Sequence, residues 1–394
     1  MKKFKVAGDL IYTLMATVVM QLVLQVMIYP LITHFYGDAV TGNILYFIGI
    51  IYIVPQALGT SLCNSRLVAR KTHDISNRDF LPHVAIFAGL SALICGFCGL
   101  NDSGNWVFSI VYGLFSVMYM LRLFASVEFR LSSNFKGYFL YYVIISVGYL
   151  LGFGLFLLTN IWLFIFILGE GFALLYTLIW GKIFRNDGTT TYQKHISKTL
   201  YIILLSISVR DCVNQLDRVI LKQTISESVV TQYNALTLIA KTVQMLVQPV
   251  NMLLLSYLTV KDSNLTKKQL LRFTGLTLLC GLVFYGVSVV GTPVFIKLFY
   301  SDFYNEIMPY NFIVNLGLIL GFVTTLFMSI LLTQGRTGLQ MTIQCIWGVI
   351  YIGASYYFST KYQIWGLAYV TLAANALKLV VLIVCVFLPQ KKKV

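Results

Sequence analysis

Twelve apolar runs follow one another along this chain, and only short polar segments separate them. A helix needs about 20 apolar residues to cross a bilayer, and these runs have that length. The longest connection, about 19 residues, leaves no room for a sizeable soluble domain. We therefore predict an all-α, polytopic membrane protein, with spanning helices at 10–33, 41–63, 83–100, 106–127, 137–158, 161–181, 199–221, 233–258, 269–291, 309–332, 339–358 and 363–388.

Composition supports this class and excludes others. Of the 394 residues, 58% are hydrophobic and only 11% are charged, whereas soluble domains are about 25% charged. The 7 cysteines all fall in apolar runs, where cysteine behaves as a small hydrophobe. Cys95 and Cys98 form a CxxC pair, but no second pair or histidine cluster accompanies it. We predict no metal, no cofactor and no catalytic group.

The basic residues predict the orientation. If the amino terminus is cytoplasmic, most lysines and arginines fall in cytoplasmic segments, and the outer loops hold little more than Lys222, Lys297 and Lys361. This asymmetry places both termini in the cytoplasm and accounts for most of the net charge of +15 without a nucleic-acid partner. The start, MKKFK and an apolar stretch, resembles a signal peptide, but the run is too long and no cleavage site follows it.

The chain also has the pattern of a duplication. With a shift of 190 residues, AVTGN at 39 falls near VVTQY at 229, Gln25 falls on Gln215, and Lys71 falls on Lys261. Each half then holds six predicted helices, and an even number implies parallel repeats. We predict two six-helix lobes, residues 1–190 and 191–394, around a central cavity.

The seventh predicted helix, LYIILLSISVRDCVNQLDRVIL, carries charges that lipid would make costly. At 100° per residue its polar residues share an arc of roughly 160°, and apolar residues fill the opposite side. The members of this polar arc are Arg210, Asp211, Asn214, Gln215, Asp217, Arg218 and Lys222. A face of this kind must meet water or protein and not lipid.

The next predicted helix has a narrower polar seam, whose members recur every three or four residues: Asn234, Thr237, Lys241, Gln244, Gln248 and Asn251. A milder version occurs in the first predicted helix, at Thr13, Thr17, Gln21 and Gln25. Residues three and four apart lie on one side of a helix. These seams therefore predict a polar lining for the cavity.

Ionisable residues at membrane depth indicate a function by default. The cations are Arg122, Arg210, Arg218, Lys241 and Lys378, and the anions are Glu170, Asp211 and Asp217. The cationic excess favours an anionic substrate. Other interpretations stay open: Asp217, Arg218 and Lys222 could extend to the interface, Asp211 and Arg218 could form a structural pair, and Glu170 could be a cation's partner or a proton site.

Several stretches resemble the Wzx-type flippases of the polysaccharide transporter family, in the superfamily that also holds the multidrug and toxic-compound extruders. They include YPLITHFYGDAVTGNILYFIGIIYIVPQAL from 29, LDRVILKQTISESVVTQYNALTLIAKTVQMLVQPV from 216, FIKLFYSDFYNEIMPYNFIVNLGLILG from 295 and YQIWGLAYVTLAANALKLV from 362. The likeness is a pattern over most of the chain, and Asp217–Arg218 is its most recognisable mark.

This resemblance implies a two-lobe flippase of a bacterial cytoplasmic membrane that works by alternating access. Its substrate would be an oligosaccharide carried on undecaprenyl pyrophosphate, moved to the outer leaflet for O-antigen or capsule synthesis. Basic residues of the lining would receive the anionic head, and by position Arg210, Arg218 and Lys241 match that lining better than Arg122 and Lys378 do. Partners would be membrane lipid, a proton or sodium ion, and a polysaccharide polymerase.

Three rival functions remain. A drug or cation antiporter of the same superfamily would use an acid such as Glu170 and an acidic or apolar cavity. A major-facilitator carrier would carry a Gly-Asp-Arg-Gly-Arg type loop, where this chain reads NSRLVARKTHDISNRDF. A membrane-embedded glycan polymerase or transferase would need a large outer loop around carboxylates such as Asp302 and Glu306, and the connections here are short.

Overall fold

The computed structural model describes residues 2–69, 77–181, 193–260, 267–334 and 336–388, with side chains for 12–69, 77–181, 199–244, 268–331, 334, 336 and 338–388. Every regular element in these ranges is a helix, as the sequence predicts. The chain divides into two compact units, Met1–Ile32 with Ile44–Gln215, and Thr33–Asn43 with Leu216–Val394. The lobe boundary at 190/191 stays a prediction, because it falls outside the described residues.

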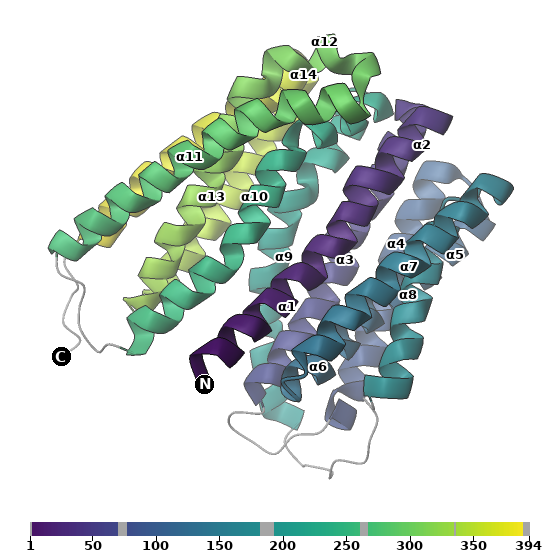
Figure 1. Ribbon diagram of the computed structural model, residues 1–394, viewed down its shortest axis with the longest axis horizontal. Helices are drawn as coiled ribbons and strands as arrows, with labels where there is room; N and C mark the ends of the chain where they lie inside the picture. The colour runs from purple at the N-terminus through teal and green to yellow at the C-terminus, as the bar shows by residue number, and fades with distance from the viewer. Residues whose placement is uncertain (1, 70–76, 182–192, 261–266, 335, 389–394) are drawn as a thin grey trace. The chain divides into compact units, whose positions relative to one another are not determined.

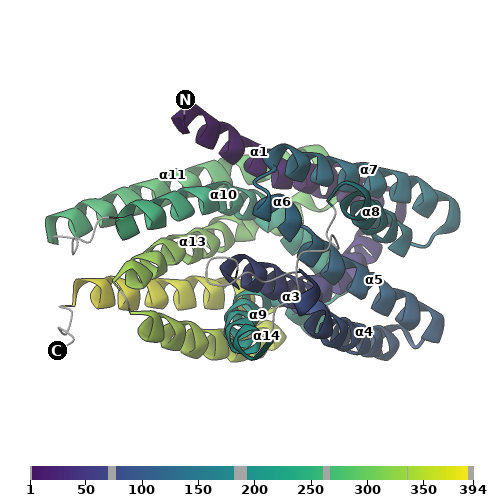
Figure 2. The ribbon, with the colours of Figure 1, turned by 90° about the horizontal axis from the view of Figure 1, so that it is seen from below.

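The elements that lie mainly in the first unit are α1 (Lys2–Leu22), the π-helix η1 (Val23–Ile28), α3 (Asp38–Ala69), η2 (Asn77–Phe80), α4 (Leu81–Ser103), α5 (Trp106–Ala125), α6 (Val127–Leu131), α7 (Phe135–Thr159), α8 (Leu163–Tyr176) and the π-helix η3 (Thr177–Gly181). Helix α2 (Tyr29–Tyr36) is divided between the two units after Ile32. Figure 2 shows α4 beside α5 and α7 beside α8, and these pairs are in contact.

Helix α9 (Gln193–Thr224) crosses from the first unit into the second at Gln215. The second unit continues with α10 (Glu227–Val260), α11 (Lys267–Phe299), η4 (Ser301–Phe303), α12 (Tyr304–Ile307), η5 (Met308–Tyr310), α13 (Asn311–Thr333) and α14 (Thr337–Phe387). Figure 1 shows α10, α11 and α13 running alongside one another, and α13 packs against both α10 and α11.

The first predicted helix is continuous but not uniform. Residues 23–28, which include Gln25, form the π-helical segment η1, and Pro30 follows directly in α2. Proline has no N–H and its ring crowds the carbonyl four residues earlier. The wider π turn therefore lies where Pro30 cannot form the usual hydrogen bond to the carbonyl four residues earlier. Segments of π-helix are frequent at functional sites.

Close helix contacts in the first unit depend on small residues. A Cβ placed on Gly148 of α7 would lie 2.6 Å from the Cα of Gly169 in α8, and one on Gly152 would lie 2.6 Å from the Cα of Ile165. Small residues four apart let helix backbones approach each other in a membrane, where van der Waals packing drives association. The pair α7–α8 therefore depends on the absence of side chains along this line.

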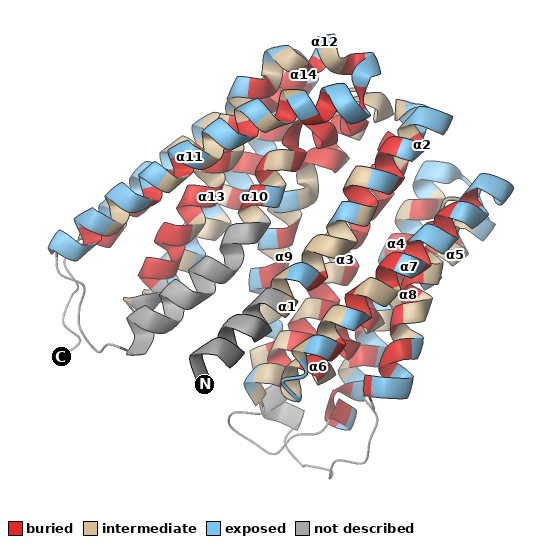
Figure 3. Cartoon of the chain, viewed as in Figure 1, coloured by how far each residue is buried: buried red, intermediate tan, exposed pale blue. Residues whose placement is uncertain are grey.

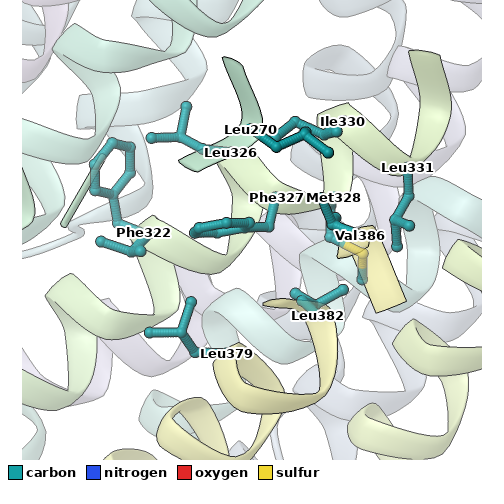
Figure 4. Packing of buried hydrophobic residues seen from close by; sticks show 11 residues of the cluster. Leu270, Phe322, Leu326, Phe327, Met328, Ile330, Leu331, Leu379, Leu382 and Val386 are labelled. Carbon is teal, nitrogen blue, oxygen red and sulfur yellow. The ribbon is translucent and has the colours of Figure 1, made fainter. Parts of the chain in front are cut away.

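The core of the second unit lies between α13 and α14, with Leu270 of α11 added. Figure 4 shows Phe327 of α13 among Leu379 and Leu382 of α14, all of them buried. Helix α14 is a hairpin, because Gln363 has a positive φ of 52° and divides it into two arms, 337–362 and 364–387. The predicted helices at 339–358 and 363–388 correspond to these arms.

Apolar side chains cover the outer surface. Helix α11 has exposed apolar residues along one side, at Leu271, Leu276, Leu279, Leu282, Val283, Val287, Val290, Val294 and Leu298. Figure 3 shows this exposed face along α11. Contiguous apolar surface of this extent marks contact with lipid.

Nine helical stretches of the described residues are long and apolar enough to span a membrane: Tyr12–Tyr36, Asp38–Ala69, Asn77–Ser103, Trp106–Leu131, Phe135–Thr159, Leu163–Gly181, Lys268–Phe299, Ser301–Leu331 and Gly338–Phe387. The last contains both arms of α14. The multi-pass membrane class is confirmed. Helices α9 and α10 are not among the nine, and α9 carries the charges that the sequence indicated.

The corner between α2 and α3 packs within the second unit, against the corner between α9 and α10. Ser228 Oγ donates to Asp38 Oδ1 at 3.2 Å, Thr231 Oγ1 donates to the Asp38 carbonyl at 2.7 Å, and Lys222 Nζ donates to Asn43 Oδ1 at 2.8 Å. Asp38 and Ser228 are 190 residues apart, the shift that aligns the two halves. Two residues that the predicted repeat would relate therefore meet here.

The α7–α8 contact predicts opposite effects for two glycines of α7. Gly148→Ala should lower the unfolding midpoint in detergent, because its Cβ must push α8 away, at a cost of about 1–3 kcal/mol. Gly154→Ala has open space, and alanine is the better helix former by roughly 1 kcal/mol, so the midpoint should hold or rise. Equal midpoints for the two variants would contradict this packing.

Candidate functional site

Each carboxylate that the sequence places at membrane depth forms an ion pair with one of the cations. Glu170 contacts Arg122, Asp211 contacts Arg210 at 2.9 Å, and Asp217 contacts Lys241 at 2.7 Å. Burying a single charge costs several kcal/mol unless an opposite charge and hydrogen bonds compensate it. The three pairs differ in how much of each partner remains exposed, and this difference distinguishes their roles.

The Arg122–Glu170 pair is closed. The side chains of the arginine and the glutamate are 2% and 0% exposed. Tyr149 donates to Glu170 Oε1 at 2.7 Å, and the Arg122 guanidinium lies 4.7 Å from the ring centre of Tyr119. Of the two interpretations of Glu170, the structure favours the partner of a cation. No substrate can reach Arg122 in this arrangement, so we assign the pair a structural role between α5 and α8.

The Arg210–Asp211 pair is open on its cationic side. The Arg210 side chain is 53% exposed, while Asp211 is only 8% exposed. Arg210 donates from Nε to Asp211 Oδ1, and Asn214, one turn further along α9, is exposed as well. The sequence predicts that α9 spans the membrane, and a guanidinium near the middle of such a helix is too costly to face hydrocarbon. On that prediction, we expect the exposed face to meet water or a ligand.

The Asp217–Lys241 pair has the same arrangement in the second unit. Lys241 of α10 is 27% exposed, and Asp217 of α9 is 8% exposed. Arg218 is buried and donates from Nη2 to Asn234 Oδ1 at 2.9 Å. Gln244, one turn beyond Lys241, is partly exposed. The α10 seam thus runs from a buried end at Asn234 to an accessible end at Lys241 and Gln244.

Lys378 lies in a different setting. Its ammonium donates to Gln344 Oε1 at 2.8 Å and lies 3.8 Å from the ring centre of Trp347, both on the first arm of α14. The side chain is buried, and no acid of the described residues pairs with it. A cation–π contact and an amide therefore hold this charge inside the second unit.

The remaining candidates are glutamines. Gln21 of α1 is partly exposed and Gln25, within η1, is buried. The side chain of Gln248 lies outside the described residues. In the parts of the chain that the structure describes, no group of three or more His, Cys, Asp or Glu side chains could hold a metal ion.

Sequence reasoning did not find the partners that position these charges. Tyr149 and Tyr119 beside Arg122 and Glu170, and Trp347 beside Lys378, lie in runs that read as uniformly apolar. Gln344 carried a weak signal, because it is an amide three residues before Trp347 in a predicted spanning helix. Because Gln344 and Trp347 are three residues apart, they lie on one side of that helix.

The sequence matches no protein-family profile and no curated protein. Solved structures do resemble the chain. The lipid II flippase MurJ, in an inward closed conformation, has a TM-score of 0.71 and 15% identity, over 95% of this chain and 87% of that chain. An inward-facing multidrug resistance MATE transporter of the MOP superfamily has a TM-score of 0.66 and 12% identity, over 96% and 94% of the two chains.

The chain has the fold of the MOP-superfamily transporters. A further member, from Pyrococcus furiosus Vc1, has a TM-score of 0.66 and 11% identity, over 96% of this chain and 93% of that chain. Its structure is described as having a binding pocket of reverse polarity that suggests a different function. At 11–15% identity, these likenesses show the fold alone.

The closed and open pairs predict different stability effects. Glu170→Gln should lower the unfolding midpoint strongly, because it leaves the buried Arg122 without its counter-charge, a loss of about 3–5 kcal/mol. Asp211→Asn should change the midpoint little, because the exposed Arg210 keeps its contact with solvent.

The double variant Arg122→Met with Glu170→Met checks the reason, since removing both charges is often nearly neutral. It should melt above either single variant in detergent. If Glu170→Gln melts like the unmodified protein, the pair is not the structural element described here.

Proposed function

We propose that this protein is a flippase that moves an oligosaccharide on undecaprenyl pyrophosphate from the inner to the outer leaflet of a bacterial cytoplasmic membrane. It would work by alternating access, with twelve spanning helices in two six-helix lobes and both termini in the cytoplasm. In this count α9 and α10 span the membrane and α14 spans it twice. The substrate would serve O-antigen or capsule synthesis, beside a polysaccharide polymerase.

One observation carries the proposal: in the ion pairs Arg210–Asp211 and Lys241–Asp217 of α9 and α10, the cation is accessible and the acid is buried. Arg210 is exposed and Lys241 is partly exposed, whereas the acids that pair with them are buried. A pyrophosphate offers several anionic oxygens, which arginine binds with two parallel hydrogen bonds and lysine binds as a point charge. Asn214 and Gln244 lie one turn from these cations and could contact the sugars.

Arg218 has a supporting place in this proposal. It is buried and oriented by Asn234, directly after Asp217 on α9. Its charge adds to the positive potential around Lys241 without direct access to a ligand. The same holds for Lys378 inside the second unit, whereas Arg122 is neutralised by Glu170.

The drug or cation antiporter is the main alternative, because MATE transporters share the fold. A cationic drug needs a carboxylate or an apolar surface that it can reach. Here the three acids at membrane depth are at most 8% exposed, and each one is paired. This polarity favours an anionic substrate over a cationic one.

The membrane potential favours outward movement of the negatively charged head group. Moving one negative charge outward from a negative cytoplasm gains about 2.3 kcal/mol for every 100 mV. A proton or sodium ion could add to this driving force, but the charge of the head group does not require one. The polyprenyl tail would remain in lipid during the movement.

The test is a mass spectrum of polyprenyl-linked lipids from cells with and without the protein. Deletion should cause a pyrophosphate-linked oligosaccharide to accumulate, and its mass would name the repeat unit. Arg210→Ala and Lys241→Ala should reproduce this accumulation with normal amounts of protein in the membrane, because each removes an accessible cation.

Lys361→Ala is the matched control. Lys361 is an exposed cation of α14 that contacts Tyr357, and its loss should leave the lipid pool unchanged. An unchanged lipid pool after deletion of the protein would refute the flippase proposal. Increased drug sensitivity of the same cells would then support the antiporter.

A further inference from the structure

The two open ion pairs share an arrangement that a simple anion site does not need. In each, a carboxylate lies behind an accessible cation and is itself shielded from solvent: Asp211 behind Arg210 and Asp217 behind Lys241. One pair lies in each unit. A site evolved only for tight binding would leave its cations without internal anions.

We infer that Asp211 and Asp217 compete with the substrate's phosphates for Arg210 and Lys241, and thereby set the rate at which the head group is released. This rests on the proposed function and assigns the two aspartates a positioning role in it. The carboxylates hold the cations in the empty protein, give way in part to a phosphate, and recover the cations when the phosphate leaves.

The geometry leaves donors for both partners. The contact between Arg210 and Asp211 uses Nε, and a guanidinium has four further N–H donors in its planar fork. Lys241 donates to Asp217 Oδ2, and an ammonium has two further N–H donors. Each cation can therefore contact a phosphate while its aspartate remains close by.

Each aspartate competes with a phosphate for the positive charge of its cation. A carboxylate at 2.7–2.9 Å neutralises much of the field that a phosphate would otherwise meet. Because the aspartates are buried, water screens them little. The bound phosphate is also repelled by the aspartate behind the cation. Binding is weakened and dissociation is accelerated, as a carrier that must release its cargo requires.

The pair between Lys222 and Glu227 has the reverse arrangement and offers a control. There the cation is 11% exposed and the acid is 39% exposed, at 3.3 Å. The acid faces outward, so it does not stand behind a cation that a substrate could reach. Neutralising Glu227 should leave phosphate binding unchanged.

The experiment measures binding of farnesyl pyrophosphate to the purified full-length protein in detergent, with farnesol as the uncharged control. Asp211→Asn should tighten binding about tenfold and slow dissociation of a fluorescent farnesyl pyrophosphate in stopped-flow measurements. Arginine stays protonated without its partner, so the change reports competition alone. Asp211→Glu should restore fast dissociation.

Lysine needs a different comparison, because a shielded lysine without its acid can lose its proton. Asp217→Asn is therefore tested together with Lys241→Arg, against Lys241→Arg alone. The double variant should bind farnesyl pyrophosphate more tightly and release it more slowly than the single variant. Glu227→Gln is measured in parallel.

The outcomes separate the two proposals. If the unmodified protein binds farnesyl pyrophosphate no better than farnesol, the proposed function fails. If it binds the pyrophosphate but Asp211→Asn binds no tighter, or dissociates no more slowly, the competition is refuted and the proposed function stands. Tightening by Glu227→Gln to the same extent would show a general charge effect and would also refute the inference.

Discussion

A charge at membrane depth must be neutralised by a second charge, by water or by a ligand, and this requirement organises the polar interior of both units. Arg122 and Glu170 neutralise each other, and both side chains are buried. Arg210 and Lys241 are neutralised from one side only, and the other side stays open. The same chemistry thus produces a structural contact in one place and a candidate binding surface in two others.

The elements that sequence could predict are those set by local chemistry. A run of about 20 apolar residues becomes a helix because lipid offers no other partner for backbone N–H and C=O groups, so the extents of α5 and α7 follow closely from hydropathy. The hairpin of α14 was predictable as two helices. Its turn at Gln363 was not, because a non-glycine residue with positive φ carries no clear sequence signal.

The candidate site was predictable only as a set of charges. Periodicity places Arg210 and Asp211 on the polar arc of their own helix, but it does not say which of them faces outward. Nor does it say that Glu170 reaches Arg122, 48 residues earlier, or that Trp347 lies under Lys378. These facts depend on which helices become neighbours. Helix neighbours follow from small residues such as Gly148 and Gly169, whose effect appears only in three dimensions.

A carrier that binds an anion has a second task, which is to return empty. Without their aspartates, Arg210 and Lys241 would then carry uncompensated charge, at a cost of roughly 0–1 kcal/mol each while water reaches them. Asp211 and Asp217 remove this cost, because each neutralises its cation whenever the phosphate is absent. In the transport cycle that we propose, the buried acids therefore belong to the empty half as much as the accessible cations belong to the loaded half. In both units the acid lies on the protected side, where it can neutralise the cation without blocking it.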